Sequence, residues 1–139
     1  MNVSGRTMEI SAFVKSSHPN HEVVVRTDAA AQSLAVATKA AGKGFAVNGG
    51  EFLMLALATC YCNDLYREAE RLRIPLESVE VEASAQFPGI GLAATNIRYR
   101  AIVSSPASAS VIAELLRRTD AVAEVHNTVR AGVPVERVA

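Results

Sequence analysis

Residues 49–64, with the sequence GGEFLMLALATCYCND, decide the fold of this 139-residue chain. Two glycines open the stretch, an apolar run follows, and the only two cysteines, Cys60 and Cys62, lie near its end. Beyond them, polar and apolar residues recur with the period of an amphipathic helix. A residue that precedes a proline resists the helical conformation, so the helix should end before Pro75. The pattern therefore predicts one long helix over residues 51–73.

The two halves of this predicted helix differ in character. The run from Phe52 to Ala58 is apolar on every side, which predicts that it is buried all round. It spans only about 10 Å, far less than the ~30 Å that a membrane crossing requires. In the second half, one stripe should face the core (Leu65, Tyr66, Ala69 and Leu72) and the other should face water (Asp64, Arg67, Glu68, Glu70, Arg71 and Arg73).

Composition and charge describe a globular protein with no electrostatic affinity for polyanions. Half of the residues are hydrophobic, 20% are charged, and the formal net charge is zero. We therefore expect a single domain over residues 1–139 that binds neither nucleic acid nor membrane. The first residues carry no apolar signal core, so a cytoplasmic location is expected. Cysteines in that reducing compartment are expected to be thiols rather than disulfides.

Strands are predicted on both sides of the long helix. Alternating patterns indicate one hairpin over residues 8–14 and 21–27, with its turn at residues 16–20, and a second over residues 79–87 and 96–103. A third short strand is expected at residues 33–38. Because the strands pair as hairpins rather than through helical crossovers, the fold class is α+β.

The C-terminal part is predicted to contain two helices and a short strand. Ser104-Ser105-Pro106 should start the first helix, with a serine cap and a proline in the first turn. Thr119-Asp120 should cap a short second helix over residues 121–129. Gly132 should end that helix, and residues 133–135 should form a terminal edge strand.

Three segments resemble the OsmC/Ohr family, named for osmotically inducible protein C and organic hydroperoxide resistance protein. Residues 51–60, EFLMLALATC, resemble the family helix E-L-L-L-A-A-L-x-x-C. Residues 74–81, IPLESVEV, resemble the step I-x-L-x-x-V-x-V into the next strand. Residues 125–135, VHNTVRAGVPV, are similar to the C-terminal segment C-P-V-x-N-T-L-x-x-G-V-P-V. The three segments occur in the family order and spacing.

The resemblance implies both an assembly and an activity. It implies an intertwined homodimer in which hairpins surround a long buried central helix. It also implies a stress-response activity in which a thiolate attacks a hydroperoxide, becomes a sulfenic acid and is resolved by a second cysteine.

The chain departs from the family at two places. By register, the second family cysteine falls on Ala123, followed by Glu124 where the family has proline. Alanine cannot resolve a sulfenic acid. The arginine that the family brings from the first hairpin loop has no clear counterpart, since Arg26 lies beyond that loop. A two-cysteine reaction therefore cannot run here as it does in the family.

Four residues remain as candidates for a thiol site. Cys60 matches the family nucleophile, although an apolar helix interior by itself raises a thiol pKa and makes it inert. Cys62 is a candidate resolving thiol, but it lies about 200° around the helix from Cys60 and can equally be a small buried hydrophobe. Glu51 aligns with the family glutamate that orients the arginine, unless the register is shifted by one and Gly50 takes that position, or it only favours the helix dipole. His126, if protonated, would lower the pKa of a nearby thiol, or it is a packing residue.

Neither a cofactor nor a metal is expected. The histidines and cysteines show no spacing typical of metal ligands, apart from His18 and His21, which are three residues apart in a predicted turn. Two functions follow for the proposed homodimer. One is reduction of an organic hydroperoxide by Cys60 alone, with Glu51 and His126 shaping its surroundings and an external thiol as reductant. The other is a non-catalytic dimer that binds a small apolar ligand.

Overall fold

The structure is a computed structural model that describes residues 7–17 and 20–138. Two residues of the predicted first turn, His18 and Pro19, lie outside the described residues. The chain forms two compact units, residues 1–49 and 50–139. The single domain over residues 1–139 stays a prediction.

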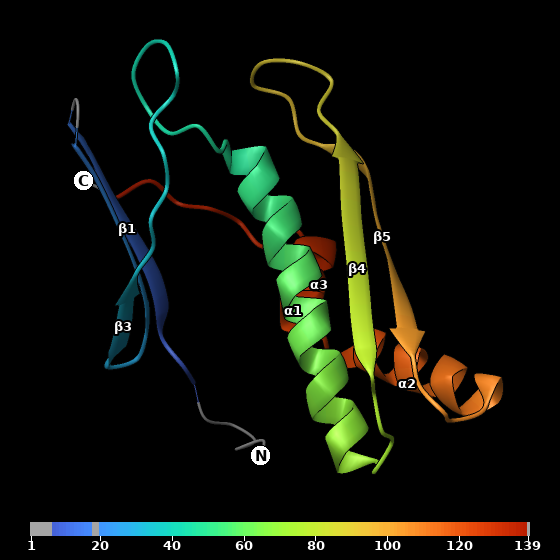
Figure 1. Ribbon diagram of the computed structural model, residues 1–139. Coiled ribbons are helices and arrows are strands. Elements are labelled where there is room, and N and C mark those ends of the chain that lie inside the picture. Colours follow the sequence, from blue (N-terminus) through green and yellow to red (C-terminus); the bar gives the residue numbers. More distant parts are fainter. Residues whose placement is uncertain (1–6, 18–19, 139) are drawn as a thin grey trace. The chain divides into compact units, whose positions relative to one another are not determined.

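The first unit is a three-stranded antiparallel sheet (Figure 1). Its strands are β1 (Ile10–Ser17), β2 (Asn20–Thr27) and β3 (Ala30–Ser33), in the order β1-β2-β3. The predicted hairpin is confirmed, with Val14 opposite Val23. The predicted third strand was misplaced. Asp28 takes a positive φ of 50°, which lets the chain turn back at once, so β3 begins earlier and Thr38 makes only an isolated bridge to Phe45.

The second unit contains a long helix, a hairpin and two shorter helices. They are α1 (Gly49–Arg71), β4 (Ser78–Gln86), β5 (Thr95–Ser104), α2 (Ala109–Val122) and α3 (Glu124–Ala131). The predicted long helix is confirmed to within two residues at each end. The second hairpin is also confirmed, with Val81 opposite Ala101. In Figure 1, α1 (green) runs beside β4 (yellow-green).

The core of this unit lies where α1 and α2 meet one face of the hairpin. Its most buried residues come from α1, from α2 and from the residue between α2 and α3: Tyr61, Leu65, Ala69, Leu115 and Ala123. Alternate residues of β4 and β5 pack against them, including Val79, Val81 and Tyr99. The opposite face of β4 carries exposed Glu80 and Glu82, as its period of two requires.

The ends of the C-terminal helices differ from the predictions in two places. Ser108, not Ser104 or Ser105, caps α2 and accepts a hydrogen bond from the backbone N–H of Val111. Thr119 does not start a new helix: it lies inside α2, fully buried, and its hydroxyl donates to the carbonyl of Leu115. Gly132 ends α3 in the left-handed conformation, as predicted.

One further prediction was wrong. Residues 133–135 form no strand in the described chain, since they pair with no other segment there. Within the single chain the first half of α1 is not buried on every side, because Phe52 is 36% and Leu55 is 56% exposed, so its burial in a dimer stays a prediction. No described helix is long and apolar enough to cross a membrane.

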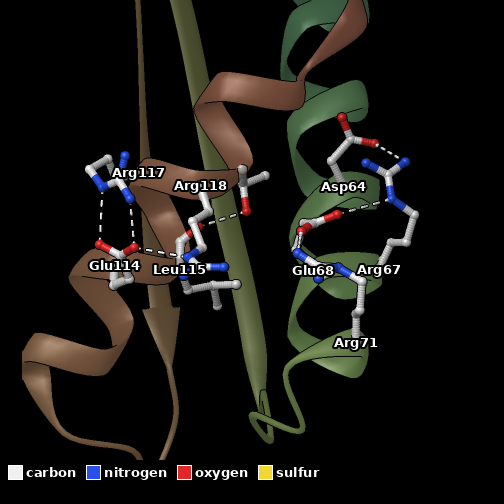
Figure 2. A network of polar contacts seen from close by, with 9 residues as sticks. Asp64, Arg67, Glu68, Arg71, Glu114, Leu115, Arg117 and Arg118 are labelled. Carbon is white, nitrogen blue, oxygen red and sulfur yellow. Dashed lines mark hydrogen bonds and ion pairs between the residues drawn. The ribbon is translucent and has the colours of Figure 1, made fainter. Parts of the chain in front are cut away.

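The charged half of α1 is more buried than its sequence indicated. Asp64 and Glu68 are only 5% and 7% exposed, whereas Tyr66 is 46% exposed. The carboxylates tolerate burial because each has a guanidinium partner. Figure 2 shows Arg67 and Arg71 beside the helix, with Arg67 at 3.0 Å from Asp64 and Arg71 at 2.7 Å from Glu68. The hydrogen bond from Arg71 lowers the pKa of Glu68.

Candidate functional site

The middle of α1 joins a thiol to a buried carboxylate. Cys60 and Asp64 are four residues apart, so their side chains lie on one face of the helix. The Cys60 thiol donates to Oδ2 of Asp64 at 3.5 Å. The other carboxylate oxygen, Oδ1, accepts a hydrogen bond from Nη1 of Arg67 at 3.0 Å. Arg67 thus holds the carboxylate in place and leaves Oδ2 facing the sulfur.

The start of α3 meets the same point of α1. Ala123, the residue where the second family cysteine falls by register, is fully buried in the core cluster against which Cys60 packs. Glu124 follows it as the first residue of α3. One ligand atom from each of Cys60, Asp64 and Glu124 lies within 4.8 Å of the other two. Two carboxylates therefore converge on the thiol.

This environment disfavours the thiolate. Burial raises the pKa of Cys60 most, the carboxylates of Asp64 and Glu124 raise it further, and a backbone hydrogen bond at Val125 opposes them. Burial also raises the pKa of Asp64, and Glu124 adds to that rise while Arg67 opposes it. Cys60 is thus a protonated thiol beside a carboxylate that can accept its proton.

His126 lies in the core behind the thiol site. It is only 3% exposed, and its ring packs against Tyr99 and Tyr61, with centroid separations of 4.5 and 5.8 Å. Neither ring nitrogen has a hydrogen-bond partner among the described residues. Burial, followed by the charge of Arg130, lowers its pKa. The imidazole is therefore neutral near pH 7, and the predicted effect of a protonated His126 on Cys60 stays a prediction.

The other two predicted site residues, Cys62 and Glu51, lie on α1 away from the face that carries Cys60 and Asp64. Both cysteines are free thiols, and Cys62 is half-buried about 200° around α1 from Cys60. Glu51 is exposed in the first turn of α1, about 14 Å along the helix axis from Cys60. Their predicted roles stay untested.

Asp64 and Glu124 are the residues that sequence reasoning missed. Asp64 was assigned to a solvent-facing stripe, although its four-residue spacing from Cys60 was a readable signal. Glu124 was noticed only as a departure from the family proline. Its approach to the thiol depends on how α3 packs on α1, which no local pattern encodes.

The comparisons with known proteins identify the family. The family model described as OsmC-like protein matches residues 41–137. No match was found among the curated proteins. An OsmC-like protein from Mycoplasma pneumoniae has a similar structure, with a TM-score of 0.61, 18% identity, and coverage of 91% of this chain and 89% of the other.

Two further solved structures share the fold. An organic hydroperoxide resistance protein from Elizabethkingia anophelis aligns with a TM-score of 0.60 and 16% identity over 94% of each chain. The organic hydroperoxide resistance protein OsmC from Legionella pneumophila aligns with a TM-score of 0.56 and 17% identity over 96% of each chain. At such identities these structures show the fold alone, whereas the family model covers more than half of the residues. This chain belongs to the OsmC-like family.

Proposed function

We propose that this protein reduces organic hydroperoxides through Cys60 in a one-cysteine reaction. Support comes from two sides. Two structural relatives are organic hydroperoxide resistance proteins by name. The observation that carries the proposal is the hydrogen bond from the Cys60 thiol to the buried Asp64 carboxylate, because it provides a proton acceptor where the nucleophile must form.

In the proposed reaction, the Cys60 sulfur attacks the terminal oxygen of the hydroperoxide. The S–O bond forms as the O–O bond breaks, and the thiol proton passes to Oδ2 of Asp64. That proton then moves to the departing alkoxide, which leaves as an alcohol. The sulfur is oxidised by two electrons to a sulfenic acid, and the hydroperoxide is reduced by the same two. Arg67, bonded to Oδ1, is a positioning residue for Asp64.

An external dithiol would complete the cycle, because Ala123 cannot form a disulfide. The first thiol of the reductant attacks the sulfenic sulfur, which releases water and leaves a mixed disulfide. The second thiol then displaces Cys60, so the reductant leaves as a disulfide and the Cys60 thiol is restored. Such reductants belong to a reducing compartment, which agrees with the expected cytoplasmic, stress-response setting.

We also propose that the working form is a homodimer. Apolar side chains that a folded chain would be expected to cover are exposed in both units, including Phe13 and Val14 of β1 and Phe52 and Leu55 of α1. A second copy of the chain would remove them from water. Size-exclusion chromatography with light scattering tests this, and a monomeric mass at micromolar concentration would contradict it.

The second candidate function is a non-catalytic dimer that binds a small apolar ligand. Ala123 in place of the family cysteine and the raised pKa of Cys60 favour it over a fast peroxidase. It predicts that Cys60→Ser leaves ligand binding intact and that the wild-type protein consumes no hydroperoxide.

The deciding experiment measures consumption of cumene hydroperoxide by chelator-treated protein with dithiothreitol as reductant. The one-cysteine reaction predicts turnover in the wild-type protein and none above background in Cys60→Ser. Cys62→Ser serves as the matched control, and we expect it to retain turnover because it keeps the Cys60–Asp64 pair. Equal consumption by wild type and Cys60→Ser would refute the enzymatic proposal.

A further inference from the structure

Cys60, Asp64 and Glu124 each offer an atom of a kind that metal ions bind in proteins. Histidine and cysteine spacing predicts no metal site, but it takes no account of carboxylate ligands. The structure brings a sulfur from α1, a carboxylate one turn later on α1 and a carboxylate from the first residue of α3 within 4.8 Å of one another. We propose that Cys60, Asp64 and Glu124 bind a divalent zinc-like ion, with the fourth position open to water.

The spacing of these atoms suits tetrahedral zinc. Zinc binds thiolate sulfur at about 2.3 Å and carboxylate oxygen at about 2.0–2.2 Å, so neighbouring ligand atoms lie roughly 3.4–3.6 Å apart. Sγ of Cys60 and Oδ2 of Asp64 are 3.5 Å apart without any rearrangement. Glu124 is exposed, so its side chain can rotate to close the third position.

The hydrogen bond that would orient Asp64 as a ligand is already in place. Metal-ligating carboxylates are commonly hydrogen-bonded through their other oxygen, which fixes their orientation. Oδ1 of Asp64 accepts such a bond from Arg67, which leaves Oδ2 available as a ligand. Asp64 is 5% exposed, so this ligand is also shielded from water.

Charge at the site is unbalanced in the direction that a cation would correct. Arg67 is shared, because it also lies 3.5 Å from Glu68. Arg130 is bonded to Asp120 at 2.7 Å. His126, two residues after Glu124, donates no hydrogen bond to either carboxylate, because its buried ring nitrogens have no partner among the described residues.

Binding of Zn²⁺ displaces the thiol proton to solvent and forms a Zn–S bond, with no change of oxidation state. The Zn–S bond would draw electron density from the sulfur and make the bound thiolate a weaker nucleophile than a free one. The site would therefore make the reactivity of Cys60 dependent on zinc. This goes beyond the proposed function, and the metal site can exist whether or not Cys60 reduces peroxide.

Cobalt serves as the spectroscopic probe. The full chain, reduced and stripped with a chelator, is titrated with Co²⁺ and followed through the thiolate-to-cobalt charge-transfer band in the near ultraviolet. We expect one equivalent of Co²⁺ to saturate the band, and we expect added Zn²⁺ to displace the Co²⁺ and abolish the band. Cys60→Ser should abolish the band, and Glu124→Gln should weaken cobalt binding by at least tenfold.

Matched controls keep the test interpretable. Glu70→Gln removes an exposed carboxylate elsewhere on α1 and should leave cobalt binding unchanged, as should Cys62→Ser. Circular dichroism checks that each variant is folded, and Glu124 is exposed, so its substitution should not disturb the core. The proposal is overturned if no saturable band forms, if Glu124→Gln binds as wild type does, or if the band depends on Cys62. The peroxide assay uses chelated protein, so its failure is separate from failure here.

Discussion

The two halves of α1 contradict a simple expectation about what a folded chain hides. In the half whose sequence is apolar on every side, Leu55 is 56% exposed. In the half that carries most of the charge, Asp64 is only 5% exposed. The buried half is covered by α2 and by the β4–β5 hairpin of the same chain, and its carboxylates bring their own arginines. Composition therefore indicates which surface of a helix must be buried, but it does not indicate which element packs against that surface.

The largest expected effect lies in the half that the chain covers itself. Leu65 is fully buried, and Leu65→Ala should lower the free energy of unfolding by about 2–5 kcal/mol because it leaves a cavity in the core. Urea denaturation followed by circular dichroism measures the change. Tyr66→Ala, one residue along and 46% exposed, is the matched control and should cost much less. Equal losses would mean that the described core is wrong.

The exposed half should matter for association instead. Leu55→Asp places a charge on the surface that we propose a second copy covers, and it should weaken dimerisation by roughly a hundredfold. Sedimentation velocity across a concentration series measures this. Glu70→Lys, a charge change on the exposed part of the buried half, should leave the association unaltered. If Leu55→Asp kept the wild-type mass at every concentration, this half would not be a dimer surface.

A third test separates two effects of Asp64 on the thiol. Its carboxylate helps to raise the pKa of Cys60, so Asp64→Asn should increase iodoacetamide alkylation of Cys60 at pH 7, by roughly tenfold for each unit that the pKa falls. The same variant should reduce peroxide more slowly than wild type, because the amide cannot take the proton. If Asp64→Asn raised the rates of alkylation and of peroxide reduction together, Asp64 would not be the proton acceptor.

The smallest expected effect concerns pH. The pKa of His126 is lowered in the folded protein, so the unfolded chain binds its proton first as the pH falls. The stability linked to His126 is therefore complete above the unfolded value of about 6.5 and is lost as pH falls through that value toward the folded one. Thermal unfolding at pH 8 and pH 5.5 should show a smaller drop for His126→Phe than for wild type.

Local patterns were enough for the elements whose neighbours lie close in sequence. The alternation in β4 and β5 and the glycine at position 132 act through adjacent residues, so they were predicted correctly. Residues 133–135 have a strand-like pattern but need a partner strand, which the described chain does not provide. Thr119 has the chemistry of a cap, yet the burial of its side chain in α2 prevails.

The site was predictable only in part for the same reason. Cys60 was found through the family resemblance, and the spacing of Asp64 could have been read from the helix period. The approach of Glu124 requires α3 to pack against α1 around Ala123, which is a tertiary event. The burial of Asp64 likewise depends on a hydrogen bond from Arg67, three residues later on the same helix, which neutralises its charge. A charged residue in the sequence therefore need not have an exposed side chain.

The most direct test of the account treats the chelated protein with one equivalent of cumene hydroperoxide in the presence of dimedone, followed by peptide mass spectrometry. Dimedone forms a stable adduct with a sulfenic acid. We expect an adduct on Cys60 in the wild-type protein, and none at position 60 in Cys60→Ser. An unmodified Cys60 after complete loss of peroxide, or an adduct confined to Cys62, would contradict it.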